Sequence, residues 1–214
     1  MNLSIHLRSA AAALALAAAS LPAAAQSVFT FDATDVAKFG PSPYGTVTLT
    51  QNGANVDFQI DLRGDMNFLT TGGHNVFAFN ASDVVIGDIV NIHDAGTETF
   101  KAIVPGIDPP FGSFGFGIIC DTGCSPGGSA GGYADPLTFT VNNAVIADFL
   151  GTKSSGGTLG RAYFAADVLI NTGDNKGATG AVGVTSAVPE PETYALMLAG
   201  IGMMGFMAKR RRPA

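Results

Sequence analysis

The sequence predicts a single all-β domain of antiparallel strands, arranged as a sandwich or jelly roll. Short runs alternate apolar and polar residues, which is the period of a half-buried strand. Turns rich in glycine and proline separate these runs, and strands and helices do not alternate regularly. The domain should span residues 26–180, which is enough chain to bury its own core.

The clearest pattern in the chain lies between residues 46 and 62. Val47 and Leu49 alternate with threonines, and a second alternating run follows them. Asn52-Gly53 lies between the runs and can adopt the positive φ angles of a tight turn. We therefore predict an antiparallel hairpin with one buried face. The core-facing residues of its second strand should be Val56, Phe58, Ile60 and Leu62.

Two later segments depart from the strand pattern. Val145, Ile146 and Phe149 have helical spacing, and Gly151 follows them, so one short helix is expected there. Residues 181–188 are mostly Gly, Ala, Thr and Val, a composition that indicates a linker after the last strand.

The N-terminus has the layout of a secretory signal peptide over residues 1–25. Arg8 precedes an apolar stretch, and Ala23 and Ala25 occupy the −3 and −1 positions of an Ala-x-Ala cleavage site. The alternative is a buried alanine-rich helix of the folded domain. The order of charge, apolar stretch and cleavage site favours export.

The exported body is strongly acidic. Of 11 Lys and Arg residues, one lies in the leader and four lie in the tail, which leaves six; of 17 acidic residues, two lie in the tail, which leaves fifteen. The resulting net charge of −9 excludes the basic surface that nucleic-acid binding requires.

The two cysteines, Cys120 and Cys124, lie in a glycine-rich loop. Export places them in an oxidising compartment, so we expect a disulfide. Such a short ring contributes about 2 kcal/mol on the chain-entropy model. Two thiols without a neighbouring histidine or a further cysteine fall short of a zinc ligand set.

Histidine and aspartate side chains are the candidate metal ligands in this sequence. His74 and His93 could join Asp88 or Asp94, but these residues have no fixed metal-ligand spacing. Solvated loop histidines and a solvated acidic face are the favoured interpretations, so no metal or cofactor is expected. The acids that could instead gather Ca²⁺ through their oxygens are Asp57, Asp61 and Asp65.

No catalytic residue is expected. Ser129 fits Gly-x-Ser-x-Gly, but it lies in a glycine-rich loop and no histidine follows it, so a nucleophile elbow is disfavoured. A non-enzymatic protein is the main hypothesis, a lectin-like glycan-binding module is the alternative, and a secreted hydrolase is the least supported. The aromatic residues expected to be exposed for glycan stacking are Tyr44, Phe111, Phe114 and Tyr133.

The C-terminus combines three parts, and the sorting and anchor segment is expected over residues 189–212. Val188, Pro189, Glu190 and Pro191 come first, and an uncharged run of 16 residues follows at 193–208. As a helix this run would measure about 24 Å, a short span for a hydrocarbon core of about 30 Å. A block of bases would hold its far end in the cytoplasm. These bases are Lys209, Arg210, Arg211 and Arg212.

This C-terminal segment resembles the PEP-CTERM sorting signal, which is found in Gram-negative bacteria that make exopolysaccharide. The resemblance implies processing by exosortase, an integral membrane enzyme. It also implies a precursor anchored in the inner membrane, then a cell-surface or extracellular product associated with exopolysaccharide or biofilm. The same tail is also called an ice-binding-protein C-terminal domain, which is no evidence of ice binding. Phe29-Thr30-Phe31-Asp32 partly matches the motif of FxDxF-type members, whose bodies are β-rich.

Overall fold

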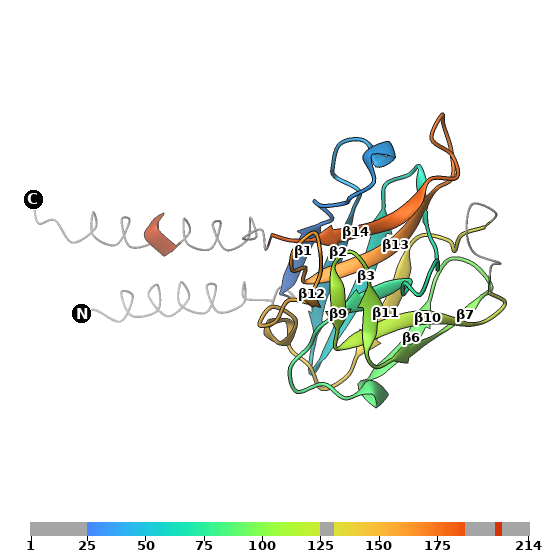
Figure 1. The fold of residues 1–214 in the computed structure, drawn as a ribbon. Helices are drawn as coiled ribbons and strands as arrows, with labels where there is room; N and C mark the ends of the chain where they lie inside the picture. The colour runs from blue at the N-terminus through green and yellow to red at the C-terminus, as the bar shows by residue number, and fades with distance from the viewer. Residues whose placement is uncertain (1–24, 125–130, 187–199, 203–214) are drawn as a thin grey trace, which may run out of the picture.

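The computed structural model describes residues 25–124, 131–186 and 200–202 (Figure 1). The body consists of antiparallel strands in three sheets, which confirms the predicted all-β class. The finer sandwich or jelly-roll arrangement stays a prediction.

The first sheet contains five strands and includes the predicted hairpin. Each strand is antiparallel to its neighbours, and the β2–β3 pair closes at Asn52 opposite Asn55. Gly53 has a φ of +62°, the conformation that the turn requires. The order across the sheet is β1 (Gln26–Thr30), β2 (Gly45–Asn52), β3 (Asn55–Leu62), β11 (Leu137–Val141) and β6 (Ile89–His93).

The second sheet has β13 near its centre, and a small third sheet adjoins it. The second sheet runs β14 (Thr179–Val184), β13 (Phe164–Ile170), β5 (Phe77–Phe79), β10 (Phe116–Thr122) and β7 (Thr99–Ile103), with β4 (Met66–Phe68) also paired to β13. The third contains β12 (Ser155–Gly156), β9 (Gly112–Phe114) and β8 (Gly106–Asp108).

Aromatic rings join the two larger sheets in one core. Phe58 on β3 stacks on Phe139 of β11 at 4.4 Å between ring centroids, and it meets Phe149 edge-on at 4.8 Å. It also contacts rings of the second sheet, namely Phe77, Phe79 and Phe164. The apolar residues predicted to face the core from β3 are all buried, which confirms the register of the hairpin.

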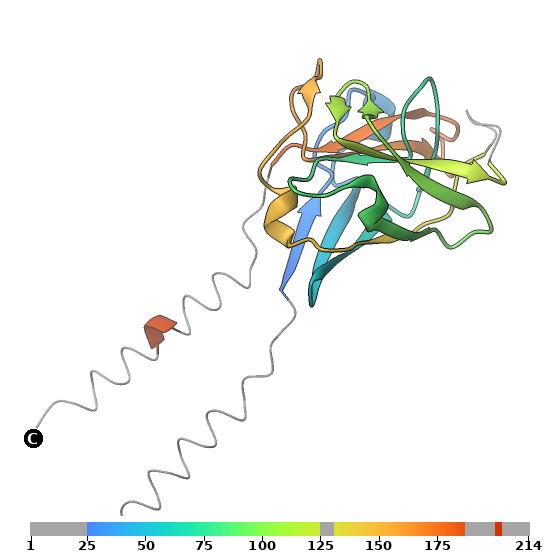
Figure 2. The same ribbon diagram turned by 90° about the horizontal axis from the view of Figure 1, so that it is seen from below.

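The short helix expected near residue 146 is a single 3₁₀ turn, η4 (Ile146–Phe149). The described body holds two more such turns, η1 (Ala37–Phe39) and η2 (Ile86–Asp88), and Figure 2 shows η2 and η4 from below. One turn of helix needs no long apolar period, so its signal in the sequence is weak.

A shared cap explains why η2 and η4 form where they do. Each follows the pattern Val-Ile-small-Asp, and the aspartate accepts the backbone N–H of the valine that precedes the turn. The Asp88 Oδ2 to Val85 N distance is 3.1 Å, and the Asp148 Oδ2 to Val145 N distance is 2.9 Å. A carboxylate in this position satisfies a backbone donor at the start of the turn.

Cys120 and Cys124 are joined by a disulfide at the end of β10. Their bond closes the turn that follows the strand, beside the Lys101–Asp121 ion pair.

We expect peptide mapping of the exported protein under non-reducing conditions to recover the two cysteines as one cross-linked species, with a reduced sample as the control. Two alkylatable thiols in the non-reduced sample would contradict this expectation.

Candidate functional site

A polar groove of about 260 Å³ lies on the solvent face of the first sheet. Strand alternation explains its composition, because the apolar residues between its members point into the core. Among the residues that the structure describes, no lysine or arginine lines this groove. Its lining residues are Gln26, Thr48, Thr50, Asp57, Gln59, Asn91, His93, Thr138 and Thr140, with Phe58 and Phe139 between them.

Hydrogen bonds hold the side chains of this polar groove in place. Thr140 Oγ1 donates to Asp57 Oδ1 at 2.7 Å, and Asn52 Nδ2 donates to Asp57 Oδ2 at 3.0 Å. His93 Nδ1 lies 2.8 Å from the carbonyl oxygen of Asn91, and its Nε2 lies 3.0 Å from the Thr138 hydroxyl. The groove therefore offers fixed hydroxyl, amide and carboxylate groups, which are suited to a polyhydroxyl ligand.

The three acids considered for Ca²⁺ are not brought together. Asp57 is bound as described above, Asp61 accepts the Gln59 amide at 2.9 Å, and Asp65 pairs with Arg63. Across the described ranges, no group of three or more His, Cys, Asp or Glu side chains could hold a metal ion. The solvated-face interpretation therefore describes Asp61 better than the metal interpretation does.

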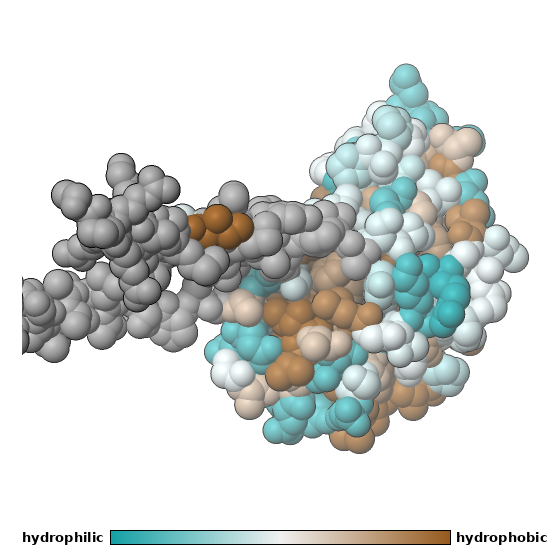
Figure 3. Space-filling model, turned by 90° about the vertical axis from the view of Figure 1, so that its left-hand side faces the viewer, coloured by the Kyte–Doolittle hydropathy of each residue, from teal (hydrophilic) through white to brown (hydrophobic). Residues whose placement is uncertain are grey.

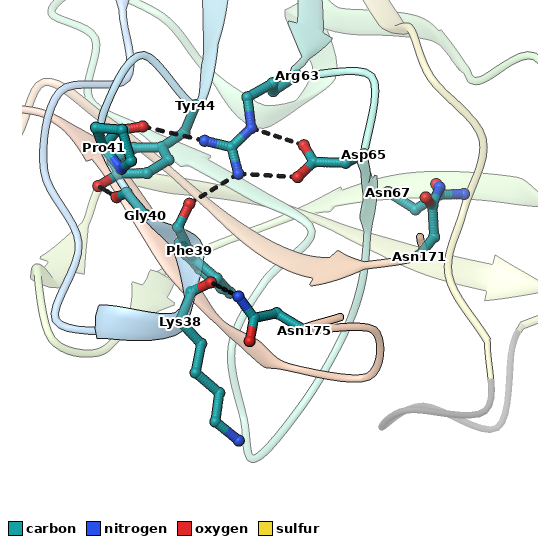
Figure 4. Close-up of polar contacts among 10 residues, drawn as sticks. All are labelled: Lys38, Phe39, Gly40, Pro41, Tyr44, Arg63, Asp65, Asn67, Asn171 and Asn175. Atoms are coloured by element: carbon teal, nitrogen blue, oxygen red, sulfur yellow. Dashed lines mark hydrogen bonds and ion pairs between the residues drawn. The ribbon is translucent and has the colours of Figure 1, made fainter. Parts of the chain in front are cut away.

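Arg63 contacts both Asp65 and the ring of Tyr44 (Figure 4). Its guanidinium donates to both oxygens of Asp65 at 2.6 and 3.0 Å, and also to the carbonyl oxygens of Phe39 and Pro41. The hydrogen bond from Arg63 lowers the pKa of Asp65. The same guanidinium lies 5.5 Å from the centre of the Tyr44 ring, so Arg63 covers this ring.

The aromatic residues expected on the surface are buried, so the predicted stacking surface is wrong in its residues. Tyr44 lies beneath Arg63, and Phe111 and Phe114 fill a second, smaller core cluster. Tyr133 meets Phe100 edge-on at 5.3 Å. Contacts with distant segments bury these rings, and the sequence of a loop does not reveal such contacts.

A second site contains buried titratable groups. His74 Nδ1 lies 2.8 Å from Asp108 Oδ1, and Asp167 Oδ2 accepts the backbone N–H and the hydroxyl of Thr71 at 2.6 and 2.7 Å. Both aspartates are fully buried. Asp108 Oδ2 and Asp167 Oδ1 have no hydrogen-bond partner among the residues that the structure places. We call these four residues the buried acid cluster.

Burial determines the protonation of the buried acid cluster. It raises the pKa of Asp108 to about 7 and the pKa of Asp167 to about 6, because the charged form loses its hydration. The hydrogen bond to Asp108 raises the pKa of His74. Thr71 and His74 also line a cavity of about 370 Å³. The other residues lining this cavity are Asp35, Val36, Pro109, Pro110, Thr158, Thr179, Gly180 and Ala181.

The structure does not bring together the predicted histidine and aspartate ligands. His74 pairs with Asp108, whereas His93 belongs to the polar groove. Asp94 accepts the backbone N–H groups of Gly96 and Ala134, and Asp88 caps η2. Sequence reasoning missed Asp108 and Asp167. The position of Asp167 within the apolar run Phe164–Ile170 was a usable signal, because an acid there must be buried.

The junction between the body and the tail is held by two charged side chains. Asp32 Oδ1 accepts the backbone N–H and the hydroxyl of Thr185 at 2.8 and 2.9 Å. Lys153 Nζ donates to the Thr185 carbonyl oxygen at 2.6 Å and lies 4.5 Å from the centre of the Tyr163 ring. Strand β14 therefore extends into the range expected for the linker, and the ordered body continues to Thr185.

Several predictions fall on residues outside the described part of the chain. These are most of the signal peptide, including Ala23, the Val-Pro-Glu-Pro segment at 188–191, which we call the box, and the bases at 209–212. Residues 200–202, within the predicted apolar run, are helical. In the three described ranges, no helix has the length and apolar character needed to cross a bilayer.

Comparison with known proteins finds a match for the tail. A family model described as the PEP-CTERM protein-sorting motif matches residues 187–212, directly after the described body. No curated protein matches the chain, and no solved structure does.

Proposed function

From the premise that this chain is an exported PEP-CTERM protein processed by exosortase, we propose a non-enzymatic body that acts at the cell surface or in the matrix. In this proposal the body associates with exopolysaccharide after sorting. The observation that carries the proposal is the sorting motif at residues 187–212, immediately after a body that is folded up to Thr185. A sorting motif fixes the route of the protein, so the role of the body must be argued from its own surface.

The polar groove supports association with a polysaccharide. Its hydroxyl and amide groups match the hydrogen-bonding pattern of sugar hydroxyls, and its side chains are already fixed by the contacts of Asp57 and His93. The body carries a net charge of −9, and the described residues that line the groove include no lysine or arginine, so an acidic polysaccharide would be repelled. A neutral glycan chain is the favoured class of ligand.

In the proposed non-enzymatic body, the buried acid cluster has a structural role. A histidine–aspartate pair assists catalysis when a nucleophile is hydrogen-bonded to the imidazole. Within the described ranges, His74 has a hydrogen bond to Asp108 and none to a hydroxyl or thiol. The Thr71 hydroxyl donates to Asp167 instead.

A lectin-like module that recognises a short, defined glycan is the second candidate. The polar groove favours it, although the residues differ from the aromatic set predicted from the sequence. A matrix protein should bind long polymer through many weak contacts, whereas a lectin should also bind an isolated oligosaccharide. Calorimetry with purified host polysaccharide and with its short fragments separates the two candidates.

The groove prediction concerns a double variant, Asp57→Asn with Thr140→Val. We expect this change to weaken polysaccharide binding about tenfold, because it removes groove hydrogen-bonding groups worth about 0.5–1.5 kcal/mol each. Asp174→Asn, which alters an exposed acid in another loop, is the control. Unchanged affinity in the double variant, with the control also unchanged, would show that this groove is not the glycan site.

A further inference from the structure

Two of the 3₁₀ turns expose aliphatic side chains that the core does not use. Val85 is 65% exposed and Ile86 is 42% exposed at η2, and Val145 is 51% exposed at η4. We call these three residues the turn patch. An exposed aliphatic residue on its own needs no explanation, but three on two adjoining turns form a shared apolar surface.

Hydrogen bonds hold η2 and η4 beside each other. Ser82 N donates to the carbonyl oxygen of Asp148 at 3.0 Å, and Asn142 N donates to that of Asp88 at 2.9 Å. The side chains of Asp88 and Asp148 cap the two turns. The turn patch is therefore presented on a fixed backbone, even though it lies in loops between strands.

The turn patch adjoins both ends of the body. Gln51 Oε1 accepts the N–H of Ile146 in η4 at 3.1 Å, and Gln51 N donates to the carbonyl oxygen of Ala25 at 2.8 Å. On the other side, Lys153 follows η4 closely in the chain and holds Thr185. Figure 2 shows η4 between the start of β1 and the end of β14. Figure 3, which faces this side of the body, shows apolar side chains gathered there.

We propose that the turn patch contacts the lipid surface of the inner membrane while the tail of the precursor is still anchored in it. This proposal rests on the proposed route of the chain through exosortase. Residues 186–192 separate Thr185 from the apolar run, and seven residues span about 25 Å at most. The side of the body next to Thr185 is therefore held close to the bilayer, where exposed aliphatic groups can enter the lipid boundary.

The chemistry of this side favours apolar contact over attraction between charges. Asp88 and Asp148 bind the backbone N–H groups of Val85 and Val145, Asp83 lies two residues before Val85 in the chain, and the body as a whole is acidic. Anionic lipid headgroups would repel these carboxylates. Neutral lipid is therefore the appropriate probe.

The chain contains no tryptophan, so single tryptophans can report on lipid contact. The full chain would carry one of three changes: Val145→Trp in the turn patch, Lys176→Trp in the loop after β13, or Phe206→Trp in the tail. Figure 1 shows the loop after β13 on the side of the body opposite the start of β1. Each protein is reconstituted in phosphatidylcholine vesicles with and without bromine-labelled acyl chains, which quench tryptophan fluorescence on contact.

We expect strong quenching at position 206, clear quenching at 145 and at most half as much quenching at 176. Quenching at 206 without a difference between 145 and 176 would overturn the lipid contact while leaving tail insertion intact. Absence of quenching at 206 would instead remove the anchored precursor on which the inference depends. A spectral shift at 145 that follows protein concentration and is independent of lipid would assign the turn patch to a second copy of the chain and overturn the proposal.

Discussion

Replacing Pro189 and Pro191 with alanine is expected to reduce C-terminal processing at least tenfold while the chain stays membrane-bound. Proline fixes φ and removes a backbone donor, so the two residues keep the box extended next to the apolar run. Alanine favours helix by about 3 kcal/mol per residue over proline, so a helix can extend through the box and bury its backbone. Intact mass and immunoblotting in a host with exosortase measure the processed fraction.

The matched substitution at the other end of the tail replaces three arginines, Arg210, Arg211 and Arg212. Neutral residues there should reduce membrane retention, because each arginine opposes passage through hydrocarbon by several kcal/mol. The two sets of variants therefore separate processing from retention. If the protein isolated from its native host still contains Arg212 by intact mass, the tail is a permanent anchor and the sorting prediction fails.

The free energy of unfolding of the body is expected to fall as pH rises from about 4 to about 7. Asp108, Asp167 and His74 each have a raised pKa in the folded state, so the folded chain binds more protons than the unfolded chain in this range. The contribution of Asp108 and Asp167 is complete below their ordinary pKa of 3.8, and it is lost as pH approaches about 7 and about 6. The pKa of His74 is raised by its hydrogen bond to Asp108, so these two residues titrate as one pair, and any contribution of His74 is lost only above 6.5.

Asp108→Asn should remove much of this pH dependence. Raising the pKa of Asp108 from 3.8 to about 7 corresponds to about 4 kcal/mol, so the variant should lose about 2–4 kcal/mol less stability than the wild type between pH 4 and 7. Urea unfolding at several pH values measures the difference. Asp174→Asn, which removes an exposed acid, should keep the wild-type slope. Coincident slopes for the wild type and Asp108→Asn would show that Asp108 ionises normally.

The sequence predicted correctly the parts of the fold that depend on the conformations of neighbouring residues, namely a strand and its turn. The alternation of Val56, Phe58, Ile60 and Leu62 identified the buried face of β3, because a strand places successive side chains on opposite faces. Asn52-Gly53 likewise identified the turn, because few residue pairs adopt its backbone angles.

The candidate sites could not be predicted in the same way, because they depend on contacts between distant segments. His74 and Asp108 are 34 positions apart, and Thr71 and Asp167 are 96 positions apart. The polar groove draws on all five strands of the first sheet, so only the strand order assembles it. Tyr44 and Tyr133 resemble exposed loop aromatics in the sequence, yet their burial depends on Arg63 and Phe100.

The contacts of Thr185 also have a mechanical consequence. A force applied to the body through its tail reaches Thr185 first. Asp32 follows β1 of the first sheet, whereas Thr185 continues β14 of the second, so their hydrogen bonds share the load between both sheets. Lys153 adds a third attachment, in the segment after η4. A body held by its C-terminus in flowing liquid would therefore resist the peeling of its edge strand β14.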